Sequence, residues 1–234
     1  MAGKSTISIT FKLDHEKGRN AVIWNDRLIR EWACTGGVTP FVDDCVNPAS
    51  LDLRLGNTIR RPHPIWERLS TVDIDRKIAD GTIEQLPKWG DPTEFSIEWL
   101  KHGEFVLLHS LEFVRIPPEA ASILVLKSSR GRDGMNHSHS GWGDPGFGYP
   151  RGGIELSAEN SAIGYSTLNT HGSGAQWTFE IYNLAKWPIK LVAGSKAIQM
   201  IMMDMKESPE RDYRYTGHYV YQSGATVAHN GGNL

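Results

Sequence analysis

The sequence has no long apolar run and almost no net charge, and each shortage excludes a class of protein. No apolar stretch in the 234 residues reaches the roughly 18 residues of a membrane span, so we expect no membrane partner. The net charge is -2, so no overall field would draw nucleic acid to the protein. The first 20 residues lack an apolar core and a small-residue cleavage site, and we therefore expect a cytoplasmic protein.

Cysteine is equally scarce, and the complete patterns of zinc enzymes are missing. The two cysteines, Cys34 and Cys45, are expected to be reduced thiols. The His-x-Glu and Pro-Cys-x-x-Cys patterns of zinc deaminases are absent, which argues against a zinc cofactor. His137 and His139 lie two residues apart, a spacing that can chelate a metal but that more often belongs to a polar loop.

Glycine and proline are plentiful, and they favour many short strands joined by turns. The 24 Gly and 12 Pro predict one mostly β domain with few helices over residues 1–234. We expect an N-terminal extension (1–20), a polar insert (148–176) and a C-terminal tail (207–234) with little core of its own.

The hydrophobic pattern predicts where the main elements lie. A helix is expected within residues 20–37, capped at Asn25 or Asp26 and stopped by two glycines. Alternating leucines over 51–55 predict a half-buried strand. Residues 62–103 are charged and show little pattern. Further strands are expected on both sides of Pro117 and Pro118, over 177–183, and on both sides of Gly194.

Glu180 is the carboxylate that the strand pattern singles out. In "WTFEIYN", residues 177–183, a period of two puts Trp177, Phe179 and Ile181 on one face and Glu180 on the other. Glu180 either faces bulk solvent or lines a cleft, where it would serve as a general acid and base. The pattern alone leaves both interpretations open.

Two loops contain further groups that could bind a ligand. The stretch "KSSRGR", residues 127–132, joins three cations and two hydroxyls around a glycine. It is either an anion cradle or an ordinary surface turn, and it lacks the Gly-Lys-Ser/Thr of a Walker loop. Asp144 precedes Pro145 and Gly146, so it is either a turn residue or a carboxylate aimed at a ligand hydroxyl.

Several segments, taken in chain order, carry a resemblance to a known family. They include "VNPASLDLRLGN", "KSSRGRDG", "HSGWGDPGF", "WTFEIYNLAKWPIKL" and "YTGHYVYQSGAT". The ordered set resembles the dCTP deaminase family of the dUTPase-like superfamily and covers well over half the chain. The resemblance implies a distorted jelly-roll or β-clip subunit, a homotrimer with active sites between subunits, and a tail that closes over the nucleotide.

The resemblance also implies an activity. It is the zinc-independent deamination of dCTP to dUTP and ammonia, with Mg²⁺ carried by the triphosphate and no metal site on the protein. Three alternatives stay open: a dUTP diphosphatase, a bifunctional enzyme that yields dUMP, and a non-catalytic nucleotide-binding relative. A modified cytosine or a monophosphate as substrate is open as well.

Each functional residue is carried over from the family's motifs. Glu180 is expected to take a proton from the water that attacks C4 of cytosine, Ser128 to hold that water, and Arg132 to orient the carboxylate. The expected substrate-binding residues are Lys127 and Ser129 at the phosphates, the Ser140 carbonyl at the water, Asp144 near the sugar, Thr178 and Phe179 beside the base and sugar, and Tyr215, His218 and Gln222 of the tail at the phosphates.

Some positions depart from the family pattern. His218 stands where lysine is usual, so the grip of the tail on phosphate is expected to depend on pH. Ser140 replaces an alanine and Gly143 an isoleucine, which would change the pocket wall. The insert at 148–176 has no counterpart in the compact members of the family.

Overall fold

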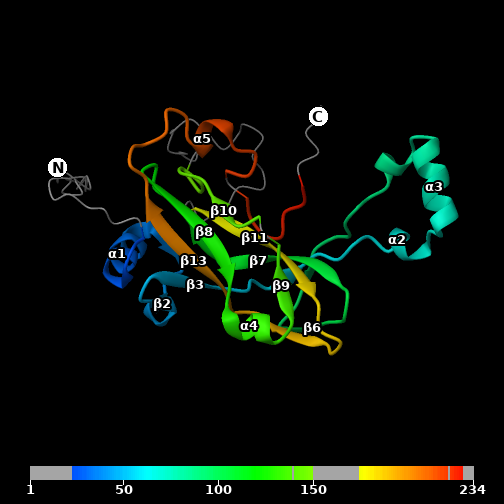
Figure 1. The fold of residues 1–234 in the computed structure, drawn as a ribbon, viewed down its shortest axis with the longest axis horizontal. Coiled ribbons are helices and arrows are strands. Elements are labelled where there is room, and N and C mark those ends of the chain that lie inside the picture. Colours follow the sequence, from blue (N-terminus) through cyan, green and yellow to red (C-terminus); the bar gives the residue numbers. More distant parts are fainter. Residues whose placement is uncertain (1–22, 139, 150–173, 221, 229–234) are drawn as a thin grey trace, which may run out of the picture.

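The computed structural model describes residues 23–138, 140–149, 174–220 and 222–228. The predicted N-terminal extension and most of the predicted insert lie outside these residues. The described part of the chain is a β-sandwich with a projecting arm (Figure 1). It is mostly β, with a few short helices around the sheets, and this composition confirms the predicted fold class.

Two antiparallel sheets make up the sandwich. The first has the strand order β1-β7-β11-β9 and the second the order β10-β8-β13-β3-β2. Their bounds are β1 Val38–Thr39, β7 Phe105–Val114, β11 Ala175–Asn183 and β9 Met135–His137 for the first sheet, and β10 Trp142–Gly143, β8 Ala120–Leu126, β13 Lys196–Asp204, β3 Ser50–Arg54 and β2 Val46–Asn47 for the second. The pair β6 (Ile97–Leu100) and β12 (Ile189–Val192) forms a separate ribbon.

One hydrophobic cluster joins the two sheets. It takes Leu108 and Phe179 from the first sheet and Leu53 and Ile198 from the second, all fully buried. The predicted alternation in β11 holds, because Phe179 and its neighbours two residues away are buried while Glu180 is only partly so. This core fixes which face of β11 carries the carboxylate.

The N-terminal helix forms as the sequence predicts. Helix α1 (Asp26–Trp32) begins at Asn25, whose side chain accepts a hydrogen bond from the Leu28 amide at 3.0 Å. Ile29 and Trp32 face the core. The helix continues through a tight turn over Ala33–Gly37, in which Gly36 takes the positive φ of 92° that favours glycine.

Strand β3 differs from the half-buried strand that its pattern predicts. In a half-buried strand Asp52, which lies between two of the alternating leucines, would face solvent, but only 2% of it is exposed. Both its carboxylate oxygens accept from the Lys127 ammonium at 2.7 Å, and the Asn47 amide donates to one of them at 2.9 Å. The half-buried prediction is wrong because a buried charge is stable once it is paired and hydrogen-bonded.

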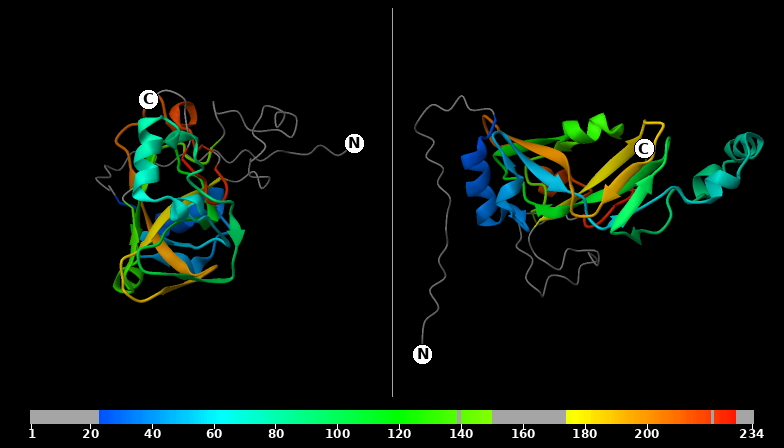
Figure 2. Two further views of the ribbon diagram at one scale, coloured as in Figure 1. Left: turned by 90° about the vertical axis from the view of Figure 1, so that its right-hand side faces the viewer. Right: turned by 90° about the horizontal axis from the view of Figure 1, so that it is seen from below.

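An arm, residues 60–96, leaves the sandwich and returns to it (Figures 1 and 2). It contains α2 (Ile65–Arg68), α3 (Thr71–Ala79) and a short turn η3 (Ile83–Gln85), and it closes by pairing β5 (Thr93–Glu94) with β4 (Thr58–Ile59). Ser70 and Asp73 form a reciprocal capping box at the start of α3. That signal was present in a stretch where we expected little pattern.

The C-terminal tail is more structured than predicted. It forms α5 (Tyr213–Thr216) and then runs along the first sheet, with Val220 and Ala225 buried. The ring of Tyr213 lies 6.0 Å from that of Phe147 and packs against the core. The tail still supplies no residue to the buried hydrophobic cluster, but it packs on the core of the sandwich, which the expectation did not include. We refer to residues 222–228 as the strap.

Candidate active site

Glu180 sits at the middle of β11, between β7 and β9. Its main chain pairs with Leu107 of β7, and its carbonyl accepts a hydrogen bond from the Ser138 amide at 3.0 Å. The side chain is partly buried on the face away from the core. The backbone ladder on both sides thus fixes where the carboxylate lies.

Two hydroxyl groups hold the Glu180 carboxylate. Ser138 and Ser140 both donate hydrogen bonds to its Oε2 atom, and their own Oγ atoms lie 2.9 Å apart. Hydrogen bonds from hydroxyl donors to a carboxylate are among the stronger ones in proteins. One carboxylate oxygen is therefore anchored, and the other makes no side-chain hydrogen bond among the described residues.

Glu180 lines a cavity of about 360 Å³. This volume falls within the range of small-molecule sites. Five of the predicted site residues line it, namely Glu180, Ser140, Asp144, Thr178 and Gln222. The Asp144 carboxylate accepts from the Trp142 indole at 2.9 Å, and the strap residues Thr226, Val227 and Ala228 close one side. The described lining residues include no lysine and no arginine.

Aromatic side chains make up much of the cavity wall, and sequence reasoning did not place them there. They are Trp89, Phe105, Trp142, Phe147, Trp177, Tyr213 and Tyr219. Phe147 and Trp177 stack with centroids 4.4 Å apart. Burial raises the pKa of the Tyr213 phenol, which therefore stays protonated near neutral pH. Such a wall suits a flat ring that binds by stacking.

The Ser-Ser-Arg-Gly-Arg stretch forms a short helix away from this cavity. Helix α4 (Ser128–Arg132) lies at the opposite end of the sandwich from α5 in Figure 1. None of its residues lines the cavity in the described chain, and Ser128, Ser129 and Arg132 are exposed. One chain by itself does not bring Ser128 and Arg132 to Glu180.

Lys127, predicted to face phosphate, forms an ion pair with another side chain of the same chain. It precedes α4 and pairs with the buried Asp52. In this protein its ammonium stabilises a buried charge, which the motif alone did not reveal. Its contact with phosphate stays a prediction.

Three other predicted residues also do not line the cavity. Phe179 is fully buried, with its ring edge-on to His137 in the core, so only its main chain can border a ligand. Tyr215 is 50% exposed and lies under the Arg214 guanidinium. His218 is exposed. In the tail, Tyr213 and Tyr219 line the cavity instead of Tyr215 and His218.

Other expectations concern metals, thiols and membranes. Within the described ranges, no three His, Cys, Asp or Glu side chains converge as a metal site, and His139 lies outside those ranges. Cys34 and Cys45 both have free thiols. Of the helices in the described part of the chain, none has the length and apolar content needed to cross a bilayer.

Comparisons with known proteins identify the family of the chain. A family model described as dCTP deaminase-like matches residues 24–205. A Hydrogenobaculum protein named "dCTP deaminase, dUMP-forming" is 30% identical over 81% of this chain and 84% of its own length. A Streptomyces coelicolor protein of the same name is 32% identical over 88% of this chain and 94% of its own.

A solved structure supports the fold. The crystal structure of 2'-deoxycytidine 5'-triphosphate deaminase from Agrobacterium tumefaciens matches 80% of this chain with a TM-score of 0.51 and 20% identity. This chain spans about half of that one, 49% of its length. Since the family model covers more than half of the 234 residues and includes β11 with Glu180, the chain belongs to the dCTP deaminase-like family.

Proposed function

We propose that the protein deaminates dCTP in the Glu180 cavity and hydrolyses the product to dUMP. The observation that carries the proposal is the Glu180 carboxylate, held by two hydroxyls inside an aromatic cavity. The names of the relatives supply the second step, because both are called dUMP-forming. They favour the bifunctional alternative over our first expectation, in which dUTP is the final product.

The first reaction breaks the bond between C4 of cytosine and its amino nitrogen. Glu180 takes a proton from a water molecule while the water oxygen bonds to C4. The proton passes to the ring nitrogen, and a second transfer through Glu180 lets ammonia leave and the carbonyl form. General acid and base catalysis of this kind contributes about 10²–10⁴-fold. The hydroxyls of Ser138 and Ser140 keep the carboxylate oriented toward the cavity.

The second reaction breaks the bond between the α- and β-phosphates. A water oxygen attacks the α-phosphorus, pyrophosphate leaves, and dUMP remains. The two steps together consume two waters and release ammonia, pyrophosphate and dUMP. Asp144, which lines the same cavity, is the second carboxylate available there.

The charge of the substrate favours a second chain as a source of cations. The cavity contains the carboxylates of Glu180 and Asp144 and, among its described lining, no cation. A triphosphate carries several negative charges and is usually bound by Arg, Lys or backbone N–H groups. Ser128 and Arg132 are exposed on α4 and do not line this cavity. We therefore assign them to the cavity of a neighbouring subunit in a homotrimer.

Magnesium belongs to the substrate in this proposal. Mg²⁺ on nucleotides is held mainly by phosphate oxygens and water, together with one or two carboxylates. Asp144 is a carboxylate of that kind at the cavity. The metal would neutralise charge on the phosphates, and the proton transfers at C4 do not involve it.

Product analysis tests the proposal directly. Purified protein is incubated with dCTP and Mg²⁺, and ammonia and nucleotides are measured by chromatography beside dCMP, dUTP, and methylated and hydroxymethylated dCTP. We expect ammonia and dUMP in equal amounts from dCTP. Accumulation of dUTP would limit the activity to deamination. Conversion of dUTP alone would make the protein a diphosphatase, and no conversion of any nucleotide would leave only binding.

A further inference from the structure

The strap closes the Glu180 cavity, and the structure shows what holds it there. Residues 222, 226, 227 and 228 line the cavity. Within the described part of the chain the strap forms no strand, and its one backbone hydrogen bond to the sandwich runs from the Gln176 amide to the Gln222 carbonyl at 2.9 Å. A segment of this kind stays in place only if side chains bind its backbone. Thr178, which lines the cavity itself, accepts a hydrogen bond from the Thr226 amide through its hydroxyl at 3.1 Å. Two further side chains, outside the cavity lining, also bind the strap.

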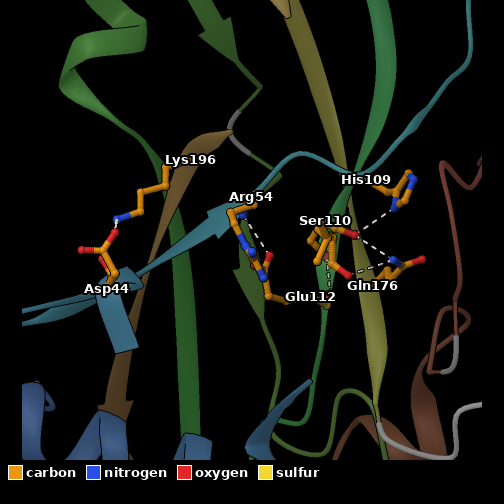
Figure 3. A network of polar contacts seen from close by, with 8 residues as sticks. Asp44, Arg54, His109, Ser110, Glu112, Gln176 and Lys196 are labelled. Carbon is orange, nitrogen blue, oxygen red and sulfur yellow. Dashed lines mark hydrogen bonds and ion pairs between the residues drawn. The ribbon is translucent and has the colours of Figure 1, made fainter. Parts of the chain in front are cut away.

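Gln176 is the first of them. Its carboxamide oxygen accepts from the Gly224 amide at 2.8 Å and from the Ser223 hydroxyl at 3.3 Å. Its carboxamide nitrogen donates to the carbonyls of Ser110 at 2.8 Å and Leu111 at 3.3 Å (Figure 3). Donors face its oxygen and acceptors face its nitrogen, so only one orientation of the amide satisfies all four groups.

A bulge in the sheet explains why an amide is needed at this position. The register between β11 and β7 shifts between Gln176 and Thr178, and the carbonyls of Ser110 and Leu111 fall at the irregularity. Buried carbonyls of this kind need a donor. Gln176 is itself buried, and its amide binds both the bulge and the strap. The Ser110 carbonyl also lies 2.8 Å from Nδ1 of His109.

Arg60 is the second side chain. Its Nε donates to the Ala225 carbonyl at 2.7 Å and its Nη1 to the Gly90 carbonyl at 2.9 Å. Gly90 follows Trp89, which lines the cavity from the arm. Arg60 therefore ties the strap to the arm, and the two walls of the cavity are fixed relative to each other.

From these contacts we infer that Gln176 and Arg60 are positioning residues that latch the strap over the Glu180 cavity before the nucleotide binds. The inference rests on the proposed function for its effect on catalysis. Because the strap is already ordered, nucleotide binding does not include the free-energy cost of ordering it. The latch therefore affects the affinity for the nucleotide. Neither side chain needs to touch the base or the phosphates.

The test measures strap order and kinetics in the full chain. Gln176→Met keeps the size of the side chain and removes its polar groups, while Gln199→Met is the matched control, because Gln199 makes one side-chain bond to Ser50 away from the cavity. In nucleotide-free protein, we expect amide hydrogen exchange over residues 222–228 to be about tenfold faster in Gln176→Met and unchanged in the control.

Kinetics separate a latch from a general structural role. With dCTP and Mg²⁺, we expect KM to rise about tenfold in Gln176→Met while kcat stays within about twofold, because saturating nucleotide closes the strap. Arg60→Met is the second variant and keeps the test decisive if Gln176→Met does not fold. Its strap should exchange faster as well.

The outcomes distinguish the latch from the proposed function. Unchanged strap exchange in the folded variants would overturn the latch, even if the wild-type protein deaminates dCTP. Faster exchange would support the latch even if wild-type protein releases no ammonia, and the proposed function would then fail alone. A fall in kcat at unchanged KM would overturn the inference that the latch acts through affinity.

Discussion

The Glu180 cavity and helix α4 are opposite in character, although the sequence predicts that they share one site. The cavity is acidic, aromatic and closed on one side by the strap, whereas α4 presents Ser128 and Arg132 to solvent. Each part lacks what the other has: the described cavity lining has no cation, and α4 has no enclosing wall. Under the proposed assignment, each chain would carry two incomplete halves of a site that a homotrimer brings together.

The largest expected effect comes from removing the carboxylate of Glu180 in the cavity. Glu180→Gln keeps the size of the side chain but cannot take a proton, so ammonia release from dCTP should fall by about 10²–10⁴-fold while nucleotide binding persists. Glu31→Gln, on the outer part of α1, is the control and should keep the wild-type rate. A Glu180→Gln variant with the full deaminase rate would disprove the role given to Glu180.

Mixing two inactive variants tests whether the halves meet between chains. Glu180→Gln and Arg132→Ala are unfolded together, refolded in equal amounts and assayed for ammonia release. If each site takes Glu180 from one subunit and Arg132 from the next, random assembly restores about one quarter of the wild-type activity. Activity no higher than that of the separate variants would place both residues in the site of a single chain.

Removing the ion pair between Asp52 and Lys127, the residue before α4, should have a smaller effect, on stability. Lys127→Met leaves the buried Asp52 carboxylate with Asn47 as its one side-chain partner among the described residues, and the free energy of unfolding should fall by about 1–3 kcal/mol. The exposed pair Arg27–Glu31 is the comparison, and Arg27→Met should cost less than about 1 kcal/mol. Denaturant unfolding measures both. Equal losses would show that Lys127 is not an anchor.

The smallest effect concerns the bulge beside the latch and depends on pH. Burial lowers the pKa of His109, which is neutral in the fold and accepts from the Thr58 amide through Nε2 at 3.3 Å. Below the unfolded value near 6.5, the unfolded chain binds a proton that the folded His109 does not. Stability should therefore fall with decreasing pH, by at most about 1.4 kcal/mol per unit from this group.

The contribution of His109 is isolated by substitution. In His109→Phe the dependence of unfolding free energy on pH between about 7.5 and 5.5 should be shallower than in the wild type, whatever its absolute stability. His63→Gln changes a partly buried histidine of the arm and is the control variant, measured in the same way. An unchanged slope in His109→Phe would contradict the assignment.

The fold was largely predictable because it depends on local patterns. The cap at Asn25, the apolar face of α1 and the alternation around Glu180 follow from residue spacing alone. The buried Asp52 did not follow, because its partner Lys127 lies 75 positions along the chain. A strand with alternating leucines and charges looks half-buried until that partner is known.

The candidate site was predictable only in part, because local motifs reveal some of its residues and not those that distant segments contribute. Motifs indicated Glu180, Asp144 and Gln222, which do line one cavity. Trp89 could not be found in this way, since it comes from an arm that showed little pattern. The roles of Gln176 and Arg60 were equally hidden, because they depend on a bulge in the β7–β11 pairing and on a strap that returns from the end of the chain.

The sequence by itself determined a mostly β subunit of the dCTP deaminase-like family with a carboxylate on the outer face of its central strand. Period-two alternation and ordered motifs are local properties that the chain carries in any conformation. Only the tertiary structure decided that the carboxylate faces two serine hydroxyls, that aromatic rings from distant segments enclose it, and that α4 points elsewhere. Those facts depend on which distant residues meet, and the packing of the two sheets settles that.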